Sequence, residues 1–123
     1  LLVLVVEDNP LNAKILTTLL RRAGLEYIEA KDGRQAVDLF ERHRPRVVLL
    51  DINMPIMNGF EACQAMRRLQ EAWGRPNEAH TIIAVTALSS EADKLRGQEA
   101  GVDEWHTKPL RLSGLVAKLQ RWR

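Results

Sequence analysis

Short apolar segments alternate with stretches of helical periodicity along the whole chain, and this alternation restricts the fold more than any other feature of the sequence. The segments that we predict as strands are residues 1–6, 27–30, 46–50, 81–85 and 104–107. The helical patterns begin at Pro10 and stop before Gly24, begin again after Gly33, and then cover 59–72, 89–100 and 112–122. Strands that alternate with helices are joined by right-handed crossovers, which build a parallel sheet covered on both faces. We therefore predict a three-layer α/β fold.

The expected order of the strands locates a site before any motif is considered. A doubly wound parallel sheet of five strands is expected to have the flavodoxin-like order 2-1-3-4-5, and such sheets bind ligands beyond the carboxyl ends of strands one and three. Strand one runs into Glu7 and Asp8, and strand three is followed by Asp51. The topology therefore predicts that three carboxylates meet at one edge of the sheet.

Length, composition and charge narrow the class of protein. The 123 residues, of which 46% are apolar, suffice for one hydrophobic core, so we predict a single domain over 1–123. The net charge is +2, and no basic stripe or recognition-helix motif indicates direct nucleic-acid binding. No apolar run is long enough to span a bilayer, so we expect a soluble, cytoplasmic domain without membrane contact. The chain opens inside a predicted strand, without methionine, as expected of a piece excised from a longer protein.

The single cysteine and the three histidines indicate no separate site. Cys63 has no partner for a disulfide and lies within an apolar helical pattern, so we expect a core residue. His43, His80 and His106 fall in different segments without metal-ligand spacing, and we expect them at the surface.

The predicted carboxylate cluster needs a cation or raised pKa values to relieve its charge. Oxygen ligands and an incomplete cage suit Mg²⁺, which keeps several waters and leaves positions for phosphoryl oxygens. A structural alternative is that Glu7 and Asp8 only cap the first helix; Asp51 at the adjacent strand end favours the metal site. Lys108 at the end of strand five and Thr86 at the end of strand four complete a set that could hold a phosphoryl group.

Four segments of the chain carry a resemblance to a known family. In chain order they are residues 7–10, residues 51–61, Thr86 with Ala87, and Lys108 with Pro109. Together they resemble the motifs of response-regulator receiver domains over essentially the whole chain. Residues 9–12 and 54–61 are similar to receivers attached to hybrid histidine kinases. The resemblance implies the CheY-like version of the predicted fold and a role in a two-component phosphorelay.

The resemblance also implies a role for each residue of the predicted site. Asp51 would accept a phosphoryl group from a phosphohistidine on a histidine kinase or a histidine phosphotransfer protein, as a covalent aspartyl phosphate. Asp8 would bind Mg²⁺ directly, Glu7 mainly through water and Asn53 through its backbone carbonyl, with Asp51 as a further ligand. Lys108 would offset charge on the transferred group. Such a domain catalyses its own phosphorylation and slow dephosphorylation and is not a conventional enzyme.

Thr86 and Trp105 occupy the switch positions of the family. Thr86 would hydrogen-bond a phosphoryl oxygen. The family usually has a smaller ring at the position of Trp105, so the resemblance does not determine how far this larger ring moves inward. The structural alternative to a switch role is that Trp105 is a strand residue half-buried against the fourth helix. That helix has few apolar residues and should shift at small energetic cost. Its face, with strand five and helix five, is the expected output surface and a candidate homodimer interface.

Two further expectations concern single positions. Leu88 is apolar and cannot position a hydrolytic water, which predicts a long-lived phosphorylated state; slower loss of phosphate in Leu88→Asn or Leu88→Glu would contradict this. The Lys108–Pro109 bond is expected to be cis by resemblance.

Two other classes of protein fit the sequence less well. A magnesium-dependent phosphatase with an aspartate nucleophile would need a second acid two residues after Asp51, and Asn53 stands there. A degenerate receiver that acts only as a protein-binding module would lack one of the acids or the lysine, and all are present.

Overall fold

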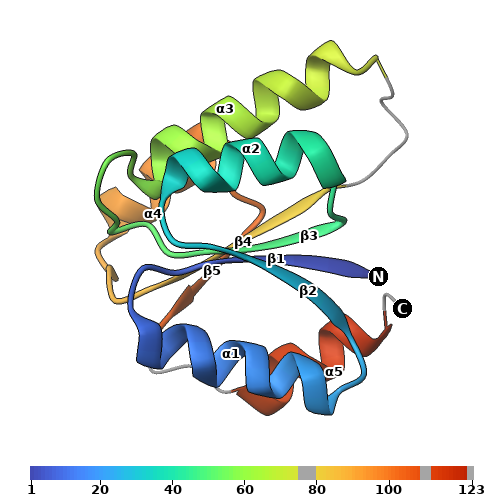
Figure 1. Cartoon of the computed structure of the whole chain (residues 1–123). Coiled ribbons are helices and arrows are strands. Elements are labelled where there is room, and N and C mark those ends of the chain that lie inside the picture. The colour runs from blue at the N-terminus through green and yellow to red at the C-terminus, as the bar shows by residue number, and fades with distance from the viewer. Residues whose placement is uncertain (75–79, 109–111, 122–123) are drawn as a thin grey trace.

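The computed structural model describes residues 1–74, 80–108 and 112–121. Strands and helices alternate along the chain as β1 (Leu2–Val6), α1 (Pro10–Arg22), β2 (Glu26–Ala30), α2 (Gly33–His43), β3 (Val47–Leu50), α3 (Gly59–Ala72), β4 (Thr81–Thr86), α4 (Glu91–Ala100), β5 (Glu104–Thr107) and α5 (Leu112–Arg121). The five strands form one parallel sheet in the order β2-β1-β3-β4-β5, which confirms the predicted topology. α1 and α5 cover one face, and α2, α3 and α4 cover the other (Figure 1).

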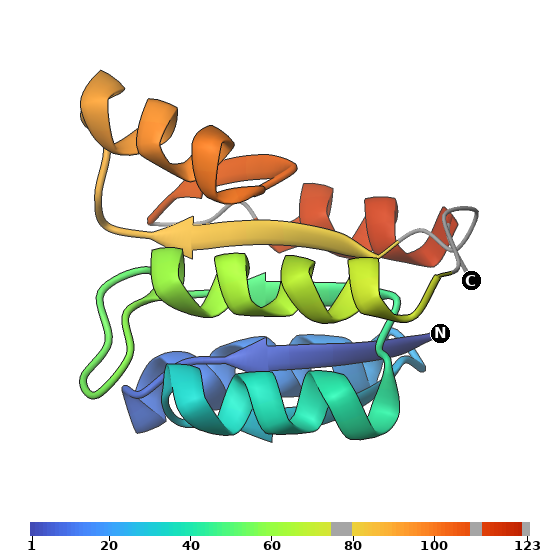
Figure 2. The ribbon, with the colours of Figure 1, turned by 90° about the horizontal axis from the view of Figure 1, so that it is seen from above.

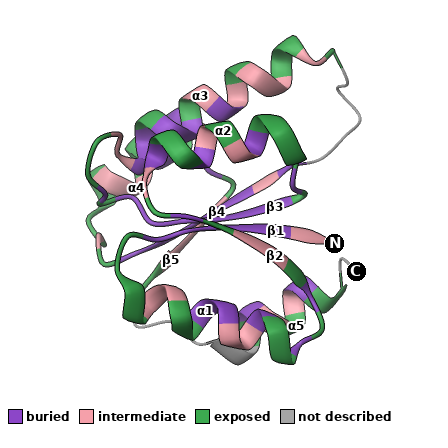
Figure 3. Ribbon diagram, in the orientation of Figure 1, coloured by how far each residue is buried: buried purple, intermediate pink, exposed green. Residues whose placement is uncertain are grey.

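The central strands are buried on both faces, which explains their continuous apolar sequences. β3 is buried at every residue, as are four of the five residues of β1 and five of the six of β4 (Figure 3). The strands point the same way, so their carboxyl ends meet at one edge of the sheet (Figure 2). There Val6 is aligned with both Ala30 and Leu50, and the residues that follow β1 and β3 leave the sheet at the same level.

Polar side chains cap the N-terminal ends of the helices, where the apolar strands give way to helical patterns. Asn9 and Asp32 accept hydrogen bonds from the first backbone N–H groups of α1 and α2, and Asn58 forms a capping box at the start of α3. Ser90 caps α4, so this helix begins at Glu91, two residues later than predicted. The predicted strand limits differ from the observed ones by at most one residue. The last predicted residue of α5 lies outside the described residues.

α1 carries two apolar stripes of helical spacing, and only one of them is buried. Leu11 and Ile15 are 68% and 43% exposed, whereas Leu16 and Leu20 are buried against the sheet. Both pairs have the spacing of one helical face, so the pattern predicted a helix without determining which side packs. Leu16 and Leu20 join residues of α5 in the core on this side of the sheet.

His80 is buried, so the prediction that it lies at the surface is wrong. Its Nδ1 is 2.7 Å from the carbonyl oxygen of Pro45, and its ring packs edge-on against Phe40 and Trp73. An aromatic side chain of α2 and one from the end of α3 therefore pack against the residue that precedes β4. The expected burial of Cys63 is confirmed.

Among the described residues, no helix combines the length and apolar character that crossing a bilayer requires.

Candidate functional site

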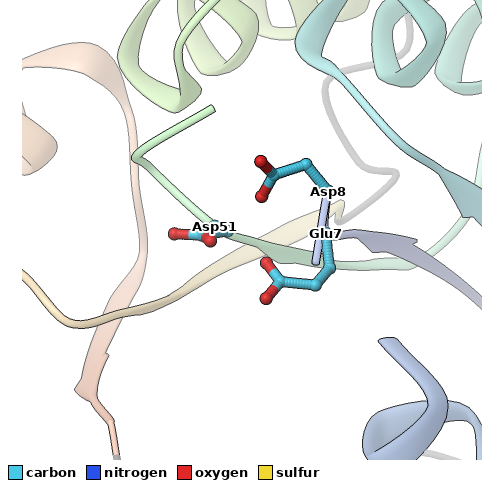
Figure 4. A group of neighbouring side chains, drawn as sticks. All are labelled: Glu7, Asp8 and Asp51. Atoms are coloured by element: carbon cyan, nitrogen blue, oxygen red, sulfur yellow. The ribbon is translucent and has the colours of Figure 1, made fainter. Parts of the chain in front are cut away.

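Three carboxylates lie together beyond the ends of β1 and β3. Glu7, Asp8 and Asp51 each offer an oxygen, and these oxygens lie within 4.8 Å of one another (Figure 4). Glu7 and Asp51 are buried, and Asp8 is exposed. The backbone explains the proximity, because the Asp51 N–H donates to the carbonyl of Val6 across the two strands, at 3.0 Å. The carboxylates meet where the strand order predicted.

Lys108 brings a cation into this cluster from the end of β5. Its Nζ donates to Oε1 of Glu7 at 3.0 Å and to Oδ2 of Asp51 at 3.4 Å. Its backbone N–H donates to the carbonyl of Thr86 at 2.8 Å, which extends the ladder between β4 and β5 beyond the last residue of β5. Burial alone would lower the pKa of Lys108, but the hydrogen bond to Glu7 and the charges of Asp51 and Glu7 outweigh it and raise the pKa. The ammonium group is thus held in its charged form between two acids.

Glu7 carries the clearest sign that this cluster lacks positive charge. Burial, together with the neighbouring Asp51, raises the pKa of Glu7 to about 7, although Lys108 lowers it in part. Its Oε2 is buried and has no hydrogen-bond partner among the described residues. An oxygen without a partner beside two further carboxylates fits a hard divalent cation, which binds such ligands. Glu7, Asp8 and Asp51 therefore could hold a metal ion.

Asn53 and Thr86 flank Asp51. The backbone N–H of Asn53 donates to Oδ1 of Asp51 at 3.2 Å, which fixes the direction of the carboxylate. The predicted role of the Asn53 carbonyl as a metal ligand stays a prediction. Thr86 is fully buried at the end of β4, next to β3, and its Oγ1 accepts the backbone N–H of Leu88 at 3.3 Å.

Trp105 is half-buried in β5, as its structural alternative required. The indole Nε1–H donates to the carbonyl of Leu88 at 3.0 Å. The ring stacks on Phe60 of α3 with a centroid distance of 6.2 Å. Thr86 and Trp105 therefore each form a hydrogen bond with the backbone of Leu88, Thr86 with its N–H and Trp105 with its carbonyl. Neither of these hydrogen bonds joins Thr86 to Trp105.

α4 is attached by few buried side chains, as its sequence predicted. Only Gly97 and Ala100 of this helix are buried, and Leu95 is 56% exposed. The expected cis bond between Lys108 and Pro109 lies outside the described residues.

Two contacts of α3 were not predicted from the sequence, one beside the site and one at the amino ends of β4 and β5. Gly59 allows α3 to begin directly against the end of β3, since a Cβ there would lie 2.5 Å from Cα of Ile52 and 2.7 Å from the carbonyl oxygen of Asp51. Arg67 fastens α3 to the turn between α4 and β5, with its guanidinium donating to the carbonyls of Gly101 and His80 and to Asp103. A glycine at a helix start gives a weak signal for such contacts, and an arginine in a helix gives none.

Comparison with known proteins agrees with this geometry. The sequence pattern described as the response regulator receiver domain matches residues 3–120. The chain belongs to this family. The receiver domain is 41% identical, over 114 residues, to the hybrid signal transduction histidine kinase I of Dictyostelium discoideum, and the match covers 88% of this chain and 6% of that kinase. The chain also spans 46% and 43% of two probable transcriptional regulators named ycf27, so it covers less than half of each of these curated relatives.

Two solved structures share the fold over nearly the whole chain. One is the receiver domain of the sensor histidine kinase PA1611 from Pseudomonas aeruginosa, with a magnesium ion coordinated in the active site cleft; its TM-score is 0.82 at 33% identity, and the match covers 98% of this chain and 95% of that one. The other is the Saccharomyces cerevisiae co-crystal structure of the histidine phosphotransfer signaling protein Ypd1 and the receiver domain of its downstream response regulator Ssk1. Its TM-score is 0.89 at 32% identity, with 99% of this chain and 88% of that one covered. The receiver fold of two-component signalling predicted from the motifs is confirmed.

Proposed function

We propose that this receiver domain accepts a phosphoryl group on Asp51 from a phosphohistidine of a partner protein, with Mg²⁺ bound by Glu7, Asp8, Asp51 and the carbonyl of Asn53. The observation that carries the proposal is the position of the Lys108 ammonium, which contacts both Glu7 and Asp51 inside the acidic cluster. A nucleophilic carboxylate, a cation and two further acids at one sheet edge are the components that phosphoryl transfer to an aspartate requires.

In this reaction a carboxylate oxygen of Asp51 attacks phosphorus, and the bond between phosphorus and the histidine nitrogen breaks with its electron pair on the imidazole. The Asn53 N–H keeps the Asp51 carboxylate oriented, and Lys108 offsets charge on the transferred group. The Thr86 hydroxyl can donate to a phosphoryl oxygen while it accepts the N–H of Leu88. Mg²⁺, when bound, supplies further charge stabilisation to the phosphoryl oxygens.

Exposed apolar side chains around the site support a protein as the phosphoryl donor. The described residues include four exposed large hydrophobic side chains, and three of them, Leu11, Ile15 and Ile56, lie on α1 and on the loop after β3. Both segments start from the strand ends that carry the acidic cluster. We infer that this surface binds the protein that carries the phosphohistidine, a histidine kinase or a histidine phosphotransfer protein. The co-crystal structure of a yeast receiver with a histidine phosphotransfer protein supports a partner of the second kind.

The face formed by α4, β5 and α5 is the proposed output surface, and a homodimer through this face is a further proposal. Phosphorylation would bias an existing equilibrium of this face, because α4 is held by few buried side chains. We also infer that residues 1–123 are one domain of a hybrid histidine kinase, which the identity to the Dictyostelium kinase supports. Light scattering with and without the phosphoryl group would test the homodimer.

The function is tested by incubating the domain with acetyl phosphate and, in a separate reaction, with a phosphorylated histidine phosphotransfer protein. Each reaction is run with Mg²⁺ and with EDTA. We expect one phosphoryl group on the wild-type protein with Mg²⁺, measured by intact mass, and none with EDTA. Asp51→Asn is the matched control and should stay unlabelled. If the wild-type protein stayed unlabelled by both donors, the binding-only alternative would replace this proposal.

A further inference from the structure

A glycine occupies a buried position inside α4. Gly97 lies within the helix, with three helical residues after it, and glycine at a helical position costs about 0.5–1 kcal/mol of stability relative to alanine. A Cβ at this position would lie 2.6 Å from Cζ3 and 2.9 Å from Cε3 of Trp105. These separations are far shorter than the roughly 3.5–4.0 Å of carbon atoms in contact. The indole ring of Trp105 therefore occupies the space that any other residue at position 97 would need.

The position of the indole ring decides which backbone group its N–H reaches. Seated against Gly97, the ring directs Nε1–H to the carbonyl of Leu88 at 3.0 Å. The N–H of the same residue donates to Oγ1 of Thr86 at 3.3 Å. Both polar backbone groups of Leu88 are thus held, one by β5 and one by β4.

Leu88 follows β4, the strand next to the one that ends just before the phosphoryl acceptor Asp51. Leu50 is aligned with Ala84 across β3 and β4, so Asp51, which directly follows β3, and Thr86, the last residue of β4, lie at neighbouring strand ends. The segment from Thr86 to Ser90 then connects this end of β4 to α4. A shift of the Trp105 ring would release the Leu88 carbonyl and loosen this segment beside Asp51.

We propose that Gly97 is a positioning residue for the chemistry at Asp51: the space it leaves seats the indole of Trp105, whose N–H fixes Leu88 and, through it, Thr86. The proposal rests on the proposed function, because it concerns the lifetime of the phosphoryl group on Asp51. It also explains how this chain accommodates tryptophan at a position where the family resemblance leads one to expect a smaller ring. The glycine and the tryptophan form a size-matched pair across α4 and β5.

A double-mutant cycle separates this role from ordinary packing. The variants are Gly97→Ala, Trp105→Phe and the two combined. Gly114→Ala is the matched control, because Gly114 also lies in a helix but a Cβ there would have no atom of the described residues within 4 Å. In Gly97→Ala we expect the indole N–H resonance of Trp105 and the amide resonance of Leu88 to shift, with faster hydrogen exchange of the indole N–H. We also expect the phosphoryl group to be lost from Asp51 at least about threefold faster, the effect of one ordinary hydrogen bond.

The cycle gives outcomes that decide the proposal. Trp105→Phe keeps a ring but has no N–H donor, so it should also shorten the phosphoryl lifetime, and adding Gly97→Ala to it should change the lifetime little further. Gly114→Ala should match the wild type in both measurements. An unchanged indole resonance and lifetime in Gly97→Ala would overturn the proposal, as would an equal effect of Gly97→Ala in the Trp105→Phe background.

Two controls keep the test informative. If Gly97→Ala does not fold, Trp105→Phe alone decides, since an unchanged lifetime in that variant would refute the role of the indole N–H. If the wild-type protein accepts no phosphoryl group, the proposed function fails, and the resonances of Trp105 and Leu88 in the unphosphorylated variants still show whether Gly97 seats the ring.

Discussion

At the scale of single residues, the carboxyl group of Glu7 should make the stability of the domain depend on pH. The pKa of this carboxyl is raised from its ordinary value of 4.5 to about 7, chiefly by burial. Between these two values the folded domain binds a proton that the unfolded chain releases, so the metal-free domain should lose stability as pH rises through this window. The loss can reach at most about 1.4 kcal/mol per pH unit for one group.

Urea unfolding in EDTA at several values of pH measures this slope. Glu7→Gln should reduce it, and saturating Mg²⁺ should reduce it in the wild type, because the cation replaces the proton at the acidic cluster. Glu26→Gln, at the exposed start of β2, is the control and should leave the slope unchanged. The assignment to Glu7 would be wrong if Glu7→Gln and Glu26→Gln gave the same slope.

Ile56 combines a strained backbone conformation with an exposed apolar side chain. It has a positive φ of 69° and is 77% exposed, and the hydrogen bond from Met57 N–H to the Pro55 carbonyl, at 2.7 Å, closes a tight turn around it. A β-branched residue is strained in this conformation, and its exposed side chain returns little stability.

We expect Ile56→Gly to stabilise the domain by about 1 kcal/mol and to slow phosphoryl transfer from a protein donor. Denaturant unfolding measures the first effect. The second is measured as the transfer rate from a histidine phosphotransfer protein divided by the rate with acetyl phosphate. Ile56→Val keeps both the strain and the apolar side chain and is the control; an unchanged ratio in Ile56→Gly would remove Ile56 from the donor surface.

At the scale of elements, the sequence predicted the existence and order of every strand and helix because each local signal agreed with the global fold. Apolar runs, polar caps and glycine stops coincide at nearly all boundaries. What the sequence could not supply was orientation. Leu11 and Ile15 repeat with the same spacing as Leu16 and Leu20, so the buried face of α1 depends on the sheet against which the helix packs.

The candidate site likewise contains residues that the sequence could predict and contacts that it could not. The acidic residues and Lys108 could be predicted because they directly follow parallel strands, whose ends must lie at one edge. The contact between Gly97 and Trp105 joins a helix and a strand through side-chain volume, which no periodicity records. The burial of His80 likewise depends on Phe40 of α2 and on Trp73, which directly follows α3.

α4 is an element for which the structure predicts frequent local opening. It buries only Gly97 and Ala100, whereas α3 buries five residues, so α4 should open more often than α3. Backbone hydrogen exchange should therefore be faster in α4, and Mg²⁺ with beryllium fluoride should change it. Asp51→Asn should remove this response. Equal exchange in α3 and α4, or a response that survives in Asp51→Asn, would contradict the prediction.

At the scale of the whole molecule, Lys108 joins distant parts of the chain at one point. It lies 101 residues from Glu7 and 57 from Asp51, and its ammonium contacts both. In the metal-free domain this contact offsets the repulsion among the acids that the fold brings together. Lys108 and a bound divalent cation therefore relieve the same charge, and each should matter more when the other is absent.

Lys108→Met separates these two contributions. Without metal, we expect the free energy of unfolding to fall by about 1–3 kcal/mol, because the carboxylates lose their positive partner. With saturating Mg²⁺ the loss should be smaller, and calorimetry should show tighter Mg²⁺ binding than in the wild type, since no ammonium group competes for Glu7 and Asp51. Lys118→Met removes a lysine that pairs with Glu104 on the α5 side of the sheet, so its effect should be the same in EDTA and in Mg²⁺. If Lys108→Met also lost equal stability in both conditions, the ammonium group and the metal ion would not share one electrostatic role, and the acidic cluster would bind its cation away from Lys108.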